Sequence, residues 1–215
     1  MVLARILAGV GRVLITAGVL LLLFVVYQLW GTGIYEARAQ DDLSSEFEAL
    51  VEQAAASTTT TPPETTTTAP ATTTTVPGAT TPTPVEAAPP APADLPLPAH
   101  GDPVAKIRIP RIGITRTVVE GVSLDQLKRG PGHYEASPLP GQAGNVAIAG
   151  HRTTYGQPFH NVDKLEPGDQ IETTTIQGTF VYAVTDTFIV KPDQVEVLED
   201  KGDDRLTLIA CHPKY

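Results

Sequence analysis

The chain has 215 residues and a formal net charge of −9, from 15 Lys and Arg against 24 Asp and Glu. This acidic balance, without a Lys/Arg cluster, argues against nucleic acid as a partner, because phosphate binding requires concentrated positive charge. The single cysteine, Cys211, excludes an intramolecular disulfide and leaves one thiol that is either a small core side chain or a reactive group.

Residues 1–33 carry the pattern of a cytoplasmic tip and a membrane anchor. Arg5 and Arg12 precede an almost wholly apolar run over residues 13–30, and about twenty such residues span a bilayer. Basic residues before the run predict a cytoplasmic N-terminus and an extracytoplasmic C-terminal part. The alternative is a cleaved signal peptide, since residues 37–39, Ala-Arg-Ala, resemble a cleavage site. The length of the apolar run favours the single-pass anchor.

A juxtamembrane stem follows at residues 34–56. Its larger apolar residues recur at helical spacing, at Leu43, Phe47, Leu50 and Val51. This spacing predicts a short amphipathic helix that lies against the membrane or a neighbour. A solvated stem is the alternative that the sequence leaves open.

A Thr/Pro-rich linker occupies residues 57–101. Three seven-residue repeats, each with four threonines and at least one proline, cover residues 58–64, 65–71 and 72–78. Such a segment cannot bury apolar surface, and its composition predicts an extended, disordered chain. We expect it to act as a stalk that lifts the C-terminal domain away from the membrane and into the cell wall. Clustered threonines beside prolines also suggest O-glycosylation.

Residues 102–215 form the predicted folded domain. Short apolar or alternating runs are separated by Gly- and Pro-containing turns, which indicates an all-β barrel or sandwich. The expected strands cover residues 105–109, 114–120, 145–149, 170–175, 179–190 and 206–210. A short helix is expected at residues 123–128, with Ser123 as its N-cap.

Two of these predicted strands end in residues that can do chemistry. One ends at Gly150-His151 and the other at Cys211. A thiolate nucleophile and an imidazole that moves protons are the minimum set for thiol-based acyl transfer. His133 is expected to be structural and His160 to lie on the surface. Scattered histidines without acidic partners at ligand spacing do not indicate a zinc site.

The pairing of Gly150-His151-Arg152 with the run Thr207-Leu-Ile-Ala-Cys211 resembles the sortases, specifically the class E members of actinobacteria. The resemblance covers residues 102–215. It implies a β-barrel of eight strands and a cysteine transpeptidase that needs no cofactor or metal. In that family Cys211 would attack the threonine carbonyl of a sorting signal to form an acyl-thioester. His151 would exchange protons with the amine leaving group, and Tyr155 would line the substrate groove.

The resemblance also implies the partners of the reaction. The substrates would be surface proteins with a C-terminal sorting signal of the Leu-x-x-Thr-Gly type, Leu-Ala-x-Thr-Gly in class E, cleaved between Thr and Gly. The acceptor would be the amine of a peptidoglycan precursor or a pilin. These properties imply a Gram-positive enzyme that anchors surface proteins to the cell wall from the outer face of the membrane.

The family has a third catalytic residue, an arginine on the strand that follows the cysteine. The sequence given ends at Tyr215, and neither Arg152 nor Arg205 matches the family position of that arginine. We therefore expect a C-terminally truncated barrel that lacks its last strand and is poorly active. The alternative function is a catalytically impaired, sortase-like peptide-binding module on a wall-spanning stalk. A third hypothesis is a stalk protein whose β domain only scaffolds partners.

Overall fold

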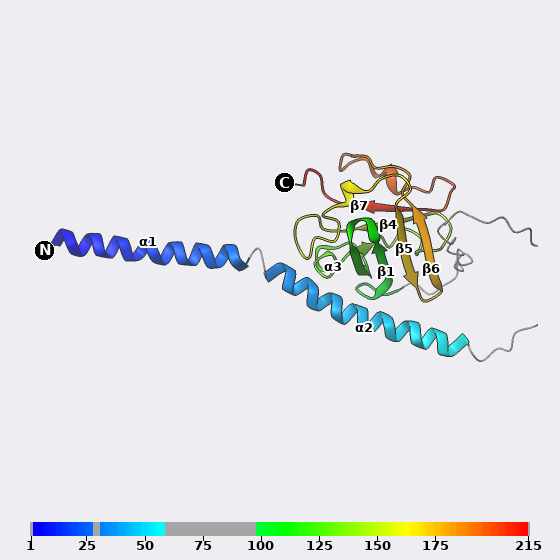
Figure 1. Ribbon diagram of the computed structural model, residues 1–215, viewed down its shortest axis with the longest axis horizontal. Helices are drawn as coiled ribbons and strands as arrows, with labels where there is room; N and C mark the ends of the chain where they lie inside the picture. Colours follow the sequence, from blue (N-terminus) through cyan, green and yellow to red (C-terminus); the bar gives the residue numbers. More distant parts are fainter. Residues whose placement is uncertain (1, 28–30, 59–97, 215) are drawn as a thin grey trace, which may run out of the picture.

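The computed structural model describes residues 2–27, 31–58 and 98–214. Two long helices precede a domain built on one seven-stranded sheet, which curls into a nearly closed barrel (Figure 1). The predicted all-β barrel with one N-terminal apolar helix is therefore confirmed. The predicted linker at residues 57–101 lies, except for its two ends, outside the described residues.

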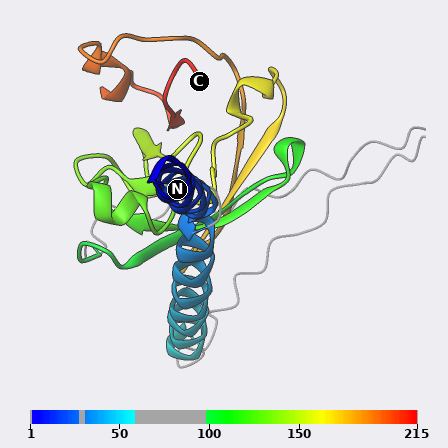
Figure 2. The same cartoon turned by 90° about the vertical axis from the view of Figure 1, so that its left-hand side faces the viewer.

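The strand order of the sheet is β6-β5-β1-β2-β3-β4-β7. Neighbouring strands are antiparallel except for two parallel pairs, β2 with β3 and β4 with β7. Figure 2 shows the segment between β6 and β7 arching over the top of the barrel. The strands are β1 (Pro103–Ile109), β2 (Ile114–Glu120), β3 (Gly132–His133), β4 (Asn145–Ala149), β5 (Gln170–Thr175), β6 (Gly178–Ala183) and β7 (Arg205–Ile209).

The predicted strands at residues 114–120, 145–149 and 170–175 have the bounds that the structure shows. The strand predicted at residues 179–190 ends at Ala183, and Phe188 and Ile189 beyond it are exposed. An alternating apolar pattern does not make a strand unless a neighbouring strand pairs with its backbone.

Short helices and turns connect the strands. Ser123 is the N-cap residue of α3, as predicted, but its hydroxyl bonds the side chain of Gln126 and makes no capping hydrogen bond to the backbone. The short elements are α3 (Leu124–Leu127), η2 (Pro110–Ile112), η3 (Val162–Lys164) and η4 (Val195–Leu198).

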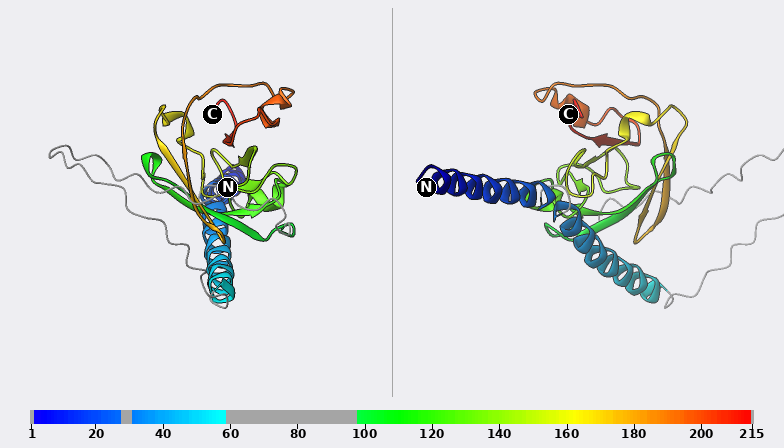
Figure 3. Two further views of the ribbon diagram at one scale, coloured as in Figure 1. Left: turned by 90° about the vertical axis from the view of Figure 1, so that its right-hand side faces the viewer. Right: turned by 60° about the vertical axis from the view of Figure 1, so that its left-hand side comes forward.

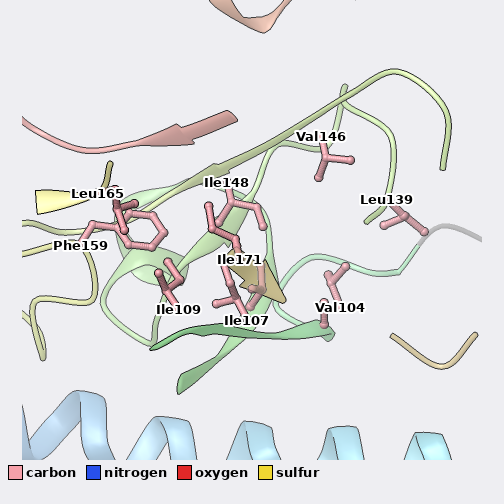
Figure 4. Close-up of a cluster of buried hydrophobic side chains, with 11 residues drawn as sticks. Val104, Ile107, Ile109, Leu139, Val146, Ile148, Phe159, Leu165 and Ile171 are labelled. Atoms are coloured by element: carbon pink, nitrogen blue, oxygen red, sulfur yellow. The ribbon is translucent and has the colours of Figure 1, made fainter. Parts of the chain in front are cut away.

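The core of the barrel lies between β1, β4 and β5. The side chains of Ile107, Ile148 and Ile171 point toward one another, and Phe159 closes one end (Figure 4). Phe159 is fully buried, although it lies on the loop that follows β4. Gly150 precedes His151 at this point because a Cβ there would lie 2.6 Å from the Phe159 ring. The packing therefore fixes where the chain leaves β4.

The strand β3, which was not predicted, carries a buried histidine that is hydrogen-bonded to a buried glutamate. His133 Nδ1 lies 2.8 Å from a carboxylate oxygen of Glu120 on β2, and His133 Nε2 lies 2.9 Å from the Pro138 carbonyl oxygen. Both side chains are almost completely buried. His133 is thus a structural residue, as expected, and it joins β2 and β3 to the loop before β4.

The helix α1 (Val2–Val26) contains a segment, Arg5–Val26, that is long and apolar enough to cross a membrane. No part of that segment is buried against the rest of the described chain. The finding fits the predicted anchor.

The helix α2 (Thr32–Thr58) is longer than the predicted stem and packs along β1 and β2 (Figure 3). Its residues Leu43 and Phe47 are buried. Of the two alternatives for the stem, the helix against a neighbour is confirmed and the solvated stem is wrong. The barrel is therefore bound to a helix that starts soon after α1. This arrangement differs from a domain carried only by a Thr/Pro stalk.

Candidate active site

The parallel pair β4 and β7 brings the two predicted catalytic residues to the same end of the sheet. Ala149 pairs with Ile209, and the Gly150 N–H donates to the Ile209 carbonyl oxygen at 3.0 Å. His151 and Cys211 each follow this paired position by two residues. Neighbouring strands lie about 4.8 Å apart, so the two residues leave the sheet side by side. Cys211 is exposed and free.

The His151 ring sits in a partly buried position beside Tyr155. The two ring centroids are 5.2 Å apart, with the planes tilted by 33°. Among the described residues, the buried His151 Nε2 has no hydrogen-bond partner. Burial lowers the pKa of His151 from its ordinary value of 6.5, because it penalises the charged imidazolium. At neutral pH this imidazole is therefore mainly neutral and able to accept a proton.

Arg152, which follows β4, binds the segment that follows β7. Its Nη1 donates to the Cys211 carbonyl oxygen at 2.9 Å, and its Nη2 lies 3.0 Å from Asp163. The side chain is only 6% exposed. His160, which was expected on the surface, is half-buried, and its Nδ1 lies 3.0 Å from the Arg152 carbonyl oxygen, so it is part of this support.

Arg152 has no role in the family resemblance, because it does not match the position of the family's catalytic arginine. The signal that could have found it is the register: in a parallel pair, the residue after His151 lies close to the segment after β7. Arg205, the other arginine considered, lies at the opposite end of β7 and pairs with Asp203.

Tyr155 lies in a loop of unusual backbone conformation. Tyr155, Gly156 and Gln157 have φ angles of 47°, 68° and 50°, all in the left-handed region. The Tyr155 ring contacts His151 on one side and Tyr35 of α2 on the other, at centroid distances of 5.2 and 6.5 Å. Its predicted place in a substrate groove stays a prediction.

No group of three or more His, Cys, Asp or Glu that could hold a metal occurs within residues 2–27, 31–58 and 98–214. The chemistry available at this end of the barrel is that of a thiol, an imidazole and the support around them.

The chain belongs to the sortase family, since the sortase-domain family model matches residues 107–215. The family is one of cysteine transpeptidases. Over 96% of its length the chain is 32% identical to Sortase SrtE1 of Streptomyces coelicolor, and it covers 53% of that protein. This match agrees with the class E resemblance. Over 54% of its length it is 32% identical to Sortase D of Bacillus subtilis, of which it covers 58%.

The chain thus spans about half the length of the curated relatives it matches. Among solved structures, a Clostridium perfringens Sortase D5 transpeptidase aligns with a TM-score of 0.50 and 37% sequence identity. That alignment covers 54% of this chain and 73% of the other. The barrel fold and the family are therefore established together.

The burial of His151 predicts a pH-dependent contribution to stability. Because the native pKa is depressed, the unfolded chain binds more protons just below pH 6.5. The contribution is present above pH 6.5 and is lost as the pH falls through the native pKa. Urea unfolding should therefore show a larger loss of stability between pH 7.5 and 5.5 in the wild type than in His151→Gln. His212→Gln, at an exposed position, is the control; equal slopes in wild type and His151→Gln would contradict the prediction.

Proposed function

We propose that this chain is a membrane-anchored, extracytoplasmic cysteine transpeptidase. It would cleave a sorting signal of the Leu-x-x-Thr-Gly type and transfer the acyl fragment to a cell-wall amine. The observation that supports this proposal is the parallel register of β4 and β7, which places His151 and Cys211 at one end of the barrel. Family membership supports the reaction class.

In the proposed reaction the Cys211 thiol gives its proton to His151, and the thiolate adds to the threonine carbonyl carbon. The carbon–nitrogen bond breaks, and the glycine amine leaves with the proton that His151 returns to it. An acceptor amine then adds to the thioester and loses its proton to His151. The carbon–sulfur bond breaks and the thiolate is restored. The lowered pKa keeps His151 neutral before the first step, and it makes the imidazolium that then forms a stronger acid toward the leaving amine.

Two residues beside His151 and Cys211 also have roles in the proposed function. Arg152 would act as a positioning residue, because its guanidinium is buried and binds the Cys211 carbonyl oxygen and Asp163. Tyr155, beside His151, would contribute a wall of the substrate groove.

The proposed location follows from α1. The candidate span Arg5–Val26 carries its two basic residues, Arg5 and Arg12, in its N-terminal half, which favours a cytoplasmic N-terminus and an extracytoplasmic barrel. The partners would be surface proteins that carry a C-terminal sorting signal, with a peptidoglycan precursor or a pilin as the amine acceptor.

The experiment is capture of the acyl-enzyme. Full-length protein in detergent is mixed with a Leu-Ala-x-Thr-Gly peptide without an acceptor amine, and its intact mass is measured. We expect an adduct equal to the peptide cleaved after threonine, absent in Cys211→Ala and discharged by an added amine. A protein that binds the peptide equally well with and without Cys211, and never gains this mass, is the binding module instead.

A further inference from the structure

The helix α2 binds the barrel through specific contacts to its backbone. The Gln40 amide nitrogen donates to the carbonyl oxygens of Thr117 at 3.0 Å and Arg129 at 2.9 Å. The Gln40 side-chain oxygen accepts from the Thr117 N–H at 2.7 Å. A Cβ at Gly130 would collide with the Gln40 side chain. One glutamine thus satisfies three backbone groups of the barrel, which a loosely tethered helix would not do.

Apolar and charged contacts extend the interface between α2 and the barrel along the helix. Leu43 is completely buried and Phe47 is 3% exposed. Glu48 pairs with Lys106 of β1 at 3.0 Å. Glu36 pairs with Arg116 of β2 at 2.8 Å and is itself 2% exposed. The contacts span three turns of α2, so the helix has one defined orientation on the barrel.

The N-terminal turn of α2 reaches the loop that carries Tyr155. The Glu36 carboxylate occupies the space beside Gly156, where a Cβ would overlap its oxygen. The Tyr35 ring meets the Tyr155 ring edge-on, at a centroid distance of 6.5 Å and an angle of 76°. The Tyr155 ring in turn contacts His151. A continuous set of contacts therefore runs from α2 to the imidazole.

The backbone of this loop needs such support. Tyr155 and Gln157 are side-chain-bearing residues in the left-handed region, with φ of 47° and 50°. Residues other than glycine keep this conformation only where their surroundings impose it. Here the surroundings are the loop's own hydrogen bonds, from the Gln157 N–H to the Thr154 carbonyl oxygen and from the His160 N–H to the Gln157 carbonyl oxygen, and, from α2, the Tyr35 ring and the Glu36 carboxylate.

We propose that α2 is a positioning element of the active site, in which Tyr35 and Glu36 hold the loop of residues 155–157 and thereby the ring of His151. The role in turnover rests on the proposed transpeptidase function, whereas the effect on His151 itself does not. Neither residue touches the reacting atoms; both act through Tyr155.

The first test changes the helix. Tyr35→Ala in the full-length chain should expose His151 and raise its pKa toward 6.5, measured by NMR titration of the imidazole. It should also lower kcat/KM by about three- to tenfold, the range expected for one lost aromatic pair. Tyr35→Phe keeps the ring and should retain both values. Lys106→Ala, which breaks a distant contact of the same helix, should change neither.

The second test changes the loop and includes a matched backbone control. Gly156→Ala forces a side chain into φ 68° and against Glu36. Gly113→Ala imposes the same φ of 68° where nothing lies within 4 Å. We expect both substitutions to lower stability, Gly156→Ala the more because of the contact with Glu36, and only Gly156→Ala to shift the His151 titration.

The two readouts separate this inference from the proposed function. His151 titrates whether or not the protein turns over a peptide, so an inactive protein with the expected shifts still supports the positioning role. Wild-type titration of His151 in both Tyr35→Ala and Gly156→Ala would overturn it, even in an active enzyme.

Discussion

Replacing Cys211 with alanine is expected to abolish cleavage of a Leu-x-x-Thr-Gly-type peptide and all labelling by a thiol reagent. The chain has one sulfur nucleophile, and its removal leaves no group that can form the thioester. A loss of kcat on the order of 10⁴-fold or more is typical of losing such a residue. Cys211 is exposed, so the fold should be unaffected. Peptide cleavage, intact mass and thermal unfolding measure the three effects.

The variant His151→Ala distinguishes the role of the proton carrier from that of the nucleophile. We expect a fall in kcat of about 10²–10⁴-fold, because general acid–base catalysis contributes that range, while Cys211 still reacts with the thiol reagent. Arg205→Ala, at the other end of β7, is the control and should keep its activity. If Cys211→Ala cleaved the peptide at the wild-type rate, a group other than Cys211 would be the nucleophile.

Replacing His133 with alanine is expected to cause the largest loss of stability of any single substitution considered. The variant leaves Glu120 buried without its partner, and an unpaired buried charge of this kind costs about 3–5 kcal/mol. The lost hydrogen bond to Pro138 adds to the same effect. Urea unfolding by circular dichroism measures the free energy of unfolding, and the thiol of Cys211 should become more reactive as β4 loosens.

A double variant distinguishes this mechanism from simple loss of volume. His133→Leu combined with Glu120→Met removes both charges and fills the space, and it should be more stable than His133→Ala alone. Lys128→Ala, which breaks an exposed pair with Asp125, should change stability little. If the double variant is as unstable as His133→Ala, packing and not the unpaired carboxylate is responsible.

The sequence predicted those parts of the fold in which one local pattern decides the structure. The strand at residues 145–149 is apolar after Asn145 and is followed by a glycine, and the structure shows the same bounds. That His151 and Cys211 leave neighbouring strands at the same end of the sheet was expected from the family resemblance, since each comes directly after a predicted strand. The strand β3 could not, because its length of two residues is too short for any periodicity.

The contacts made by α2 could not be predicted from the sequence either. The spacing of Leu43 and Phe47 indicated an apolar helix face, but periodicity does not identify the surface that covers it. Gln40, which makes the backbone contacts, is polar and belongs to no pattern. Arg152 was missed for a related reason: its role depends on the register of two strands 60 residues apart in the chain, not on its sequence neighbours.

The position of α2 also limits how far the enzyme can reach. Thr32 follows Val26 by six positions, which an extended chain covers in about 20 Å. If α1 lies in the bilayer as proposed, the first turn of α2, which contacts the loop beside His151, would lie within about 20 Å of the membrane surface. Polypeptides just emerging from the membrane would meet the thiol first, and chains deep in the peptidoglycan would lie out of range.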